Sequence, residues 1–150
     1  RGYDSAGIAM QNGPTIRRLR TYGKVRDLQA LLDETPLQGV CGIAHTRWAT
    51  HGKPNTLNAH PLMSRDNVAL IHNGIIENHE ELRTELQQLG FEFTSETDTE
   101  VMAHLVNHLL SQGNDLFAAV RKAAVRLRGA FAIAVISAQE PGVAHRYGRL

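Results

Sequence analysis

The chain has 150 residues, which is long enough for one domain with its own hydrophobic core. Hydrophobic residues make up 42% of it, and 16 basic residues nearly balance 15 acidic ones, so its charge gives no reason to expect a nucleic-acid or membrane-surface partner. Its longest nearly apolar run, residues 130–136, is much shorter than the roughly 20 residues that a membrane-spanning helix needs.

The first part of the chain is predicted to contain two strands and a helix. The sequence opens at Arg1, and "RGYDSAG" reads as the interior of a longer chain, so we expect a fragment. Residues 6–10 and 15–22 flank the turn-like "QNGP" and predict two strands. Residues 25–34 place apolar side chains on one stripe and are followed by a proline, which predicts a helix.

Two short apolar runs, residues 39–45 and 67–73, predict buried strands. The first contains the only cysteine, Cys41, which cannot form an internal disulfide and is therefore consistent with a reducing, cytoplasmic location. Residues 49–66 show little periodicity, and a loop of this length is usually functional or disordered.

The second half of the chain is predicted to contain helices at residues 79–89, 101–110 and 116–127. The candidate capping residues are Asn78, a Thr97–Glu100 capping box and Asn114. Residues 91–94 and 130–138 predict two further strands. Because strands and helices do not alternate regularly, we expect an α+β fold with mainly antiparallel sheets and helices outside.

Eight histidines raise the question of a metal site. His104 and His108 have the i, i+4 spacing of helical metal ligands but lack the accompanying glutamate, so a solvated helix face is favoured. His45, His51 and His60 have no carboxylate or thiolate at ligand spacing apart from Cys41. The sequence therefore predicts neither a metal nor another cofactor.

Polar residues follow the predicted strands or open the predicted helices, where side chains and backbone N–H groups face clefts. Arg47 could clamp a carboxylate and Trp48 could form a wall. Spacing alone gives at least equal weight to a surface salt bridge for Arg47 and core packing for Trp48. Asn73 and Gly74 could form an oxyanion hole or an ordinary turn. Asp98 could accept an ammonium group or only favour a helix N-terminus. Together these groups describe a pocket for an α-amino acid with a scissile acyl group.

Several motifs occur together in a known order: "RGYDSAG", "GIAHTRWATHG", "NAHP", "HNGIIENH", "SETDTEV" and "LRGAF". With these motifs almost the whole chain resembles the glutaminase domain of the glutamine–fructose-6-phosphate aminotransferases, or glucosamine-6-phosphate synthases, which are class II glutamine amidotransferases. Amidophosphoribosyltransferase and asparagine synthetase share the plan but look less similar around "HTRWATHG" and "HNGIIENH".

The resemblance implies the αββα sandwich of the N-terminal-nucleophile hydrolases, here incomplete, and the hydrolysis of L-glutamine to glutamate and ammonia. Sugar-isomerase domains of the same parent chain, expected to be a homodimer, would use the ammonia to convert fructose 6-phosphate to glucosamine 6-phosphate. The resemblance implies that Arg47 holds the α-carboxylate, Asp98 holds the α-ammonium and Trp48 closes the site. It assigns the oxyanion hole to Asn73 and Gly74, and further substrate contacts to Thr50, His51, Arg1 and Gly2.

The family's nucleophile is a cysteine at the mature N-terminus, and its own α-amine can act as the base because the two groups titrate close together. In the family this cysteine precedes "RGYDSAG", so the resemblance implies that these 150 residues lack it and are inactive. Alternatives are a non-catalytic glutamine-binding or regulatory module, the glutaminase domain of another class II amidotransferase, and a hydrolase that uses Cys41. Against the last, Cys41 lies in an apolar run typical of a buried strand.

Overall fold

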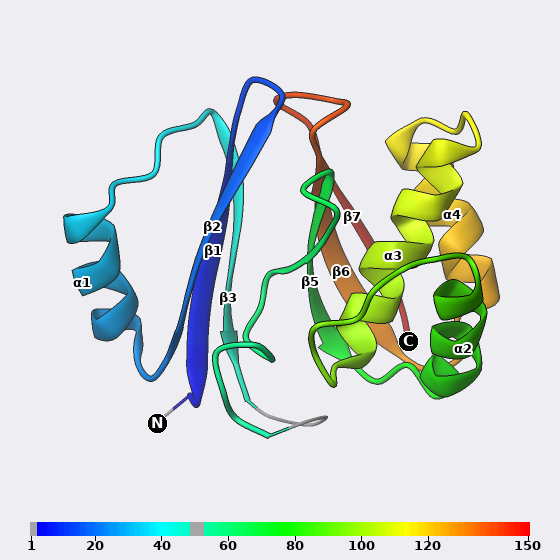
Figure 1. The fold of residues 1–150 in the computed structure, drawn as a ribbon, viewed down its shortest axis with the longest axis horizontal. Coiled ribbons are helices and arrows are strands. Elements are labelled where there is room, and N and C mark those ends of the chain that lie inside the picture. Colours follow the sequence, from blue (N-terminus) through cyan, green and yellow to red (C-terminus); the bar gives the residue numbers. More distant parts are fainter. Residues whose placement is uncertain (1–2, 49–52) are drawn as a thin grey trace.

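Two antiparallel sheets face each other and carry helices on both outer sides (Figure 1). The structure is a computed structural model that describes residues 3–48 and 53–150. The first sheet has the order β2-β1-β3, with β1 (Ser5–Asn12), β2 (Thr15–Tyr22) and β3 (Cys41–Arg47). The second sheet has the order β4-β5-β6-β7, with β4 (Leu62–Ser64), β5 (Val68–Gly74), β6 (Phe131–Ser137) and β7 (Ala144–Arg149).

Helix α1 (Val25–Glu34) lies on the outer side of the first sheet, and three helices cover the second sheet (Figure 1). These are α2 (His79–Gln88), α3 (Asp98–Ser111) and α4 (Leu116–Arg126). All strand pairs are antiparallel among the described residues. The predicted α+β class and the αββα layering are therefore confirmed.

The inner faces of the two sheets meet in a small apolar core. Side chains alternate between the two faces of a strand, so Ala9 and Ile43, which are paired across β1 and β3, point the same way toward the second sheet. There they pack with Ala69 and Ile136. The Gln11 side chain crosses the same layer and donates a hydrogen bond to the Ser137 carbonyl at 2.6 Å.

The larger core lies between the second sheet and helices α2–α4. Val68 and Leu70 alternate with the inner-core residues of β5 and pack against α3. Helix α3 is buried well beyond the single predicted stripe, since residues 98–107 are all buried. The reason is its place, because the sheet covers one side of α3 while α2 and α4 cover others (Figure 1).

Helix capping was predicted only in part. Thr97 caps α3 as expected, because its hydroxyl accepts a hydrogen bond from the Glu100 N–H at 3.2 Å. The second bond of a capping box, from the Thr97 backbone N–H to the Glu100 carboxylate, is not formed. Helix α4 is capped by Asp115, which accepts from Ala118 N–H at 2.7 Å, so the prediction of Asn114 was wrong. Asn78 precedes α2 without a side-chain cap bond.

Three strand predictions need correction. Residues 91–94 form no strand, because Phe91 enters the larger core and the backbone bonds to side chains of α3 instead. Strand β4 was missed because it has only three residues. Strand β7 was missed because "AHRYGR" has no apolar alternation, which reflects its place at the edge of the sheet.

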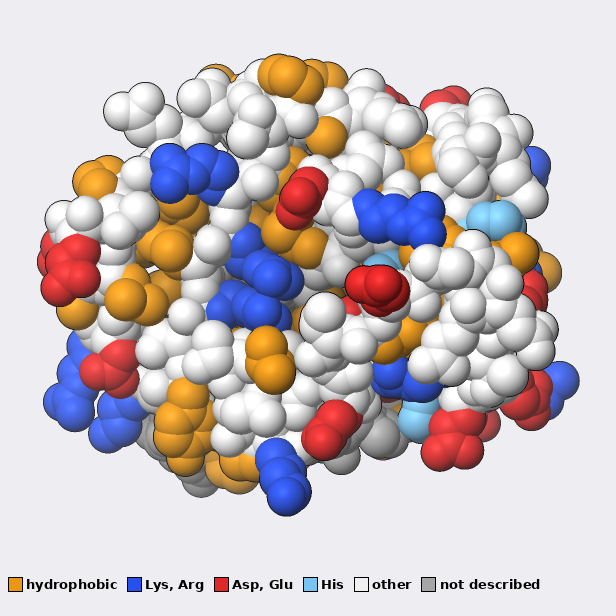
Figure 2. Space-filling model, viewed as in Figure 1, with side chains coloured by type: hydrophobic (Ala, Val, Ile, Leu, Met, Phe, Trp, Pro, Cys, Tyr) orange, Lys and Arg blue, Asp and Glu red, His pale blue; other side chains and the backbone are white. Residues whose placement is uncertain are grey.

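The surface carries mixed charge. On the face shown in Figure 2, Lys and Arg side chains gather near the middle and acidic side chains lie around them, so neither sign dominates. Within residues 3–48 and 53–150, every helix is too short or too polar to cross a bilayer.

Candidate functional site

A cavity of about 250 Å³ lies where β3, β5 and α3 meet. Arg47 is the last residue of β3, Gly74 is the last residue of β5, and Asp98 is the first residue of α3. Two strand ends and a helix N-terminus therefore converge, which is a common setting for polar ligands. The cavity brings together five predicted site residues, Arg47, Trp48, Asn73, Gly74 and Asp98. The other four, Arg1, Gly2, Thr50 and His51, lie outside the described residues.

Arg47 is the cationic group of the cavity. It is only 4% exposed, and β3 delivers it there because the strand register pairs Arg47 with Ser5 at the start of β1. Burial lowers the pKa of its guanidinium, while the nearby carboxylates of Asp4 and Asp98 act in the opposite direction. A buried guanidinium presents a rigid fork of donors, which suits a carboxylate.

Asp98 is the anionic group and is 3% exposed. One carboxylate oxygen, Oδ2, accepts a hydrogen bond from the Ile76 backbone N–H at 2.9 Å, and the other, Oδ1, lies 3.8 Å from His72 Nδ1. Its place in the first turn of α3 puts the carboxylate at the positive end of the helix dipole. The cavity thus offers opposite charges on Arg47 and Asp98, which is the pattern that binds a zwitterion.

Asn73 and Gly74 form a third polar group on the end of β5. The side-chain oxygen of Asn73 lies 2.8 Å from His45 Nε2 on β3. Because that oxygen faces a ring nitrogen that can donate, the Asn73 NH₂ group remains as a donor. Gly74 has φ 119°, and a Cβ there would lie 2.3 Å from the Ala130 carbonyl oxygen, so only glycine fits.

Three histidines, His45, His60 and His72, line the cavity, and none of them was predicted as a site residue. The rings of His45 and His60 stack with their centroids 4.3 Å apart, and the centroids of the His60 and His72 rings are 6.5 Å apart. Burial lowers the pKa of His45, and lowers that of His60 further because the neighbouring rings and arginines add repulsion. Among the described residues, no group of three or more side chains is placed to hold a metal ion.

The loop that carries His60 is fixed to the first sheet. Arg18 donates to the Pro61 carbonyl at 3.1 Å, and Arg20 donates to the Ala59 carbonyl at 2.9 Å. Gly7 lets this loop come close, because a Cβ at that position would lie 1.9 Å from the His60 carbonyl oxygen. These contacts place His60 of the "NAHP" motif in the wall of the cavity.

Trp48 and Cys41 had open interpretations. Trp48 lines the cavity and is 65% exposed, so the alternative of core packing is excluded. Cys41 pairs with Gln11 at the opposite end of β3 from Arg47 and packs against the inner core. Six residues of strand span about 20 Å, which places the Cys41 thiol well away from the cavity.

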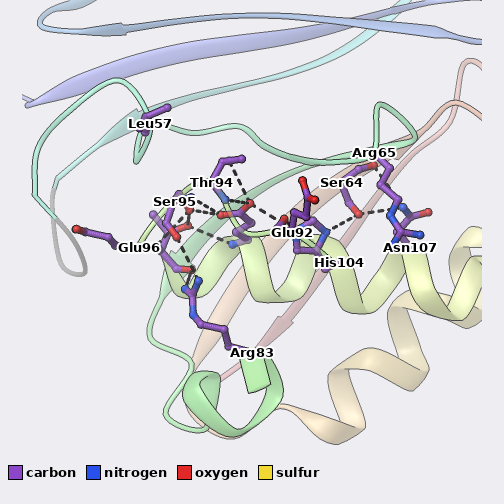
Figure 3. Close-up of polar contacts among 12 residues, drawn as sticks. Leu57, Ser64, Arg65, Arg83, Glu92, Thr94, Ser95, Glu96, His104 and Asn107 are labelled. Carbon is purple, nitrogen blue, oxygen red and sulfur yellow. Dashed lines mark hydrogen bonds and ion pairs between the residues drawn. The ribbon is translucent and has the colours of Figure 1, made fainter. Parts of the chain in front are cut away.

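A second cavity, of about 480 Å³, borders a polar network around Glu100. The Glu100 carboxylate accepts hydrogen bonds from the backbone N–H groups of Thr94 and Ser95, at 2.9 and 2.7 Å, and from both hydroxyls. Figure 3 shows Thr94 and Ser95 close together near the start of α3, and His104 farther along the helix beside Ser64. The network holds residues 91–97 onto the helix.

His104 belongs to this network rather than to a solvated helix face. It is 3% exposed, its Nδ1 lies 2.7 Å from Ser64 Oγ, and its Nε2 lies 2.9 Å from the Glu92 carbonyl oxygen. The prediction of a solvated face was wrong for His104, because the 91–97 loop folds over that side of α3.

Residues 45–146 match a family model described as a glutamine amidotransferase domain. The chain is 57% identical over 143 residues to the glutamine–fructose-6-phosphate aminotransferase (isomerizing) of Pseudomonas putida and 54% identical over 142 residues to that of Legionella pneumophila. These matches cover 94% of this chain, which spans about a quarter of the length of these relatives, 23% and 24% respectively.

Solved structures with the same architecture include glutamine phosphoribosylpyrophosphate amidotransferase from B. subtilis in complex with ADP and GMP, with a TM-score of 0.75 at 28% identity. That match covers 91% of this chain and 30% of the other. A glutamine aminotransferase class-II domain protein from Silicibacter pomeroyi shares the fold, with a TM-score of 0.63 at 21% identity, over 97% of this chain and 69% of the other. The sandwich is that of the N-terminal-nucleophile hydrolases, and the chain belongs to the glutamine amidotransferase domain family.

Proposed function

We propose that the cavity binds L-glutamine and is the glutaminase site of a glutamine–fructose-6-phosphate aminotransferase. The observation that carries the proposal is that Arg47, Asp98 and the Asn73–Gly74 pair line one cavity. Arg47 would hold the α-carboxylate and Asp98 the α-ammonium. The side-chain amide carbonyl of glutamine would then lie against the Asn73 NH₂ and the Gly74 N–H.

The size and charge of the cavity support a small zwitterion. A volume of about 250 Å³ is below the range of about 300–1,000 Å³ that is typical for drug-sized ligands. Both charged side chains are nearly completely buried, so each interacts with a ligand under little screening by water. A neutral or singly charged ligand would leave one of the two without a counter-charge from the ligand.

The Asn73–Gly74 pair supplies the chemistry of the proposed site. Attack on the glutamine amide carbonyl moves negative charge onto its oxygen, and donors fixed in advance stabilise that charge. The contact with His45 fixes the Asn73 amide, and the close approach of Ala130 fixes the backbone at Gly74. Trp48, at the rim, would close the site over the ligand.

The nucleophile of the proposed reaction is a cysteine outside these 150 residues, because their only cysteine is Cys41. Its thiol would displace ammonia from the glutamine amide to give a thioester, and water would then release glutamate and the thiol. By itself, this segment would bind glutamine without turning it over. Arg1, Gly2, Thr50 and His51 remain proposed contacts of the ligand or nucleophile.

The activity of the whole protein is also part of the proposal. The relatives that are more than 50% identical are about four times as long and are named for fructose 6-phosphate. Sugar-isomerase domains in the same protein, acting as a homodimer, would use the ammonia to form glucosamine 6-phosphate. The proposed location is the reducing cytoplasm, where Cys41, which is free, would stay reduced.

Calorimetry with the 150-residue chain tests the binding step. We expect L-glutamine to bind, and D-glutamine and glutaramate, which lacks the α-amine, to bind at least about tenfold more weakly because each loses a buried charged contact. No heat of binding with a folded chain would reject the proposal.

A second assay, with the full-length protein that carries this segment, separates the enzyme from a regulatory module. The proposal predicts ammonia release from glutamine and glucosamine 6-phosphate formation from fructose 6-phosphate. Binding of glutamine without any ammonia release would favour the regulatory module instead.

A further inference from the structure

His60, Thr99 and His72 form a closed ring of hydrogen bonds behind the cavity. The His72 backbone N–H donates to His60 Nδ1 at 3.3 Å. His60 Nε2 lies 3.2 Å from the Thr99 hydroxyl oxygen, which in turn lies 3.1 Å from His72 Nδ1. All three side chains are nearly completely buried, with exposures between 1% and 5%.

The backbone donor sets the direction of this ring. A backbone N–H can only donate, so His60 Nδ1 must be the unprotonated acceptor, and a neutral His60 then carries its proton on Nε2. That N–H donates to the Thr99 oxygen. Within the described part of the chain, the hydrogen-bond partners of the Thr99 hydroxyl are the two imidazoles, so its own hydrogen goes to His72 Nδ1.

The direction of these hydrogen bonds determines the charge of His72. Because His72 Nδ1 accepts from Thr99, the ring is neutral and its proton lies on Nε2. Asp98 Oδ1 is 3.8 Å from that same Nδ1, too far for a hydrogen bond but close enough for an ion pair if His72 were charged. A charged His72 would therefore compete with a ligand ammonium for the Asp98 carboxylate.

His60 also acts on the other end of the cavity. Its ring stacks on His45 with an interplanar angle of 20°, and His45 in turn holds the Asn73 amide. We propose that His60 is a positioning residue for the glutamine pocket, keeping His72 neutral beside Asp98 through Thr99 and keeping His45 in place beside Asn73. This inference rests on the proposed function of the cavity.

The surroundings of His60 keep it neutral. The charged or titratable groups that face it come from each neighbouring strand: His45 and Arg47 on β3, His72 on β5 and Arg20 on β2. Burial is the largest effect that lowers its pKa, and repulsion from these groups adds to it. On α3, Asp98 lies 3.8 Å from His72 Nδ1, and the ring centroids of His72 and His60 are 6.5 Å apart. The ring of hydrogen bonds should therefore persist through neutral pH and fail only on acidification.

Nitrogen NMR of the ¹⁵N-histidine-labelled chain tests the ring without any need for activity. We expect, at pH 7, His60 and His72 both unprotonated at Nδ1 and protonated at Nε2. An imidazolium at either residue, or a proton on His60 Nδ1, would overturn the proposal.

The variants Thr99→Val and Thr99→Ser test the positioning role. Without the hydroxyl, His72 Nδ1 loses the donor that keeps it unprotonated beside Asp98, so L-glutamine affinity should fall severalfold from pH 8 to pH 6. The unchanged chain and Thr99→Ser, which keeps the hydroxyl, should show little change over the same range. The control is Thr84→Val on the exposed face of α2.

The outcomes are distinct. A folded Thr99→Val chain with the flat pH profile of the unchanged chain overturns the role of the ring. If Thr99→Val does not fold, the tautomers in the unchanged chain and the profile of Thr99→Ser decide the matter. If the unchanged chain does not bind L-glutamine, the proposed function fails and the positioning role with it, while the NMR tautomers still report whether the ring exists.

Discussion

His45 Nε2 lies 2.8 Å from Asn73 Oδ1, and this contact joins the first sheet to the second at the cavity. His45 comes from β3 and Asn73 from β5, which are facing strands of different sheets. The contact therefore depends on how the two sheets pack, and it fixes which end of the Asn73 amide can serve as a donor to a ligand.

Replacing His45 should loosen the Asn73 amide. In His45→Leu the amide loses the donor to its oxygen and can rotate, so we expect L-glutamine affinity to fall about five- to tenfold, the effect of one lost buried hydrogen bond. His45→Gln, whose amide can still donate to Asn73, should retain most of the affinity. Calorimetry measures both, and equal affinity of His45→Leu and the unchanged chain would show that Asn73 does not need the contact.

Arg47→Lys should weaken binding although it keeps the charge. Lysine is a point charge and cannot form the two parallel hydrogen bonds of a guanidinium with a carboxylate, so we expect a loss of about 1.5–3 kcal/mol. Arg17→Lys on the exposed face of β2 is the matched control and should bind as tightly as the unchanged chain. Unaltered binding by Arg47→Lys would mean that Arg47 does not clamp the ligand.

Asp98→Asn should remove the preference for a ligand with an α-amine. The change is isosteric and keeps an oxygen to accept from Ile76 N–H, but it removes the negative charge. The unchanged chain should favour L-glutamine over glutaramate by at least about tenfold, and Asp98→Asn should bind the two almost equally. Asp33→Asn on exposed α1 serves as the control. If Asp98→Asn keeps the preference, another group binds the ammonium.

Acid should destabilise the chain in two separate ranges of pH. His45 and His60 have pKa values lowered from 6.5, so below pH 6.5 the unfolded chain binds more protons than the folded one. The two histidines therefore contribute fully to the free energy of unfolding above pH 6.5, and this contribution is lost as the pH falls below that value. Burial alone would raise the pKa of Glu100, but contacts with His104, Ser95 and Thr94 outweigh it and lower the pKa from 4.5 to about 2.

The Glu100 contribution is therefore present above pH 4.5 and is lost as the pH falls toward 2. We expect it to be worth about 3 kcal/mol at pH 7. Urea unfolding of Glu100→Gln should show a destabilisation of that size at neutral pH that shrinks below pH 4. Glu92→Gln, at an exposed position in the same loop, should unfold like the unchanged chain. A Glu100→Gln deficit that does not change with pH would contradict this account.

Local sequence patterns were enough to predict much of the fold and the charged residues of the site. The Thr97 cap depends on residues three apart, and Arg47 and Asp98 lie at the ends of elements whose patterns are strong. The resemblance of the motifs then assigned roles that spacing alone left open. Trp48 shows that limit, since its sequence neighbours are equally compatible with a core or a rim position.

Contacts between distant segments could not be predicted in the same way. The stacking of His45, His60 and His72 joins residues from two strands and a loop, so it exists only after both sheets and the loop have packed. The destination of the Glu100 carboxylate was missed for the same reason. The capping-box pattern pointed it at Thr97, but the 91–97 loop turns the N–H groups of Thr94 and Ser95 toward it instead.

Mapping of L-glutamine by NMR on the ¹⁵N-labelled chain tests the central claim most directly. Two cavities compete for a polar ligand, and their linings differ. We predict that L-glutamine shifts the backbone amide signals of Asn73, Gly74, Asp98 and Thr99 while those of Arg65, Gly90 and Thr94 at the larger cavity stay unchanged. Shifts centred on Arg65, Gly90 and Thr94, or no shifts at saturating L-glutamine, would contradict the assignment of the site.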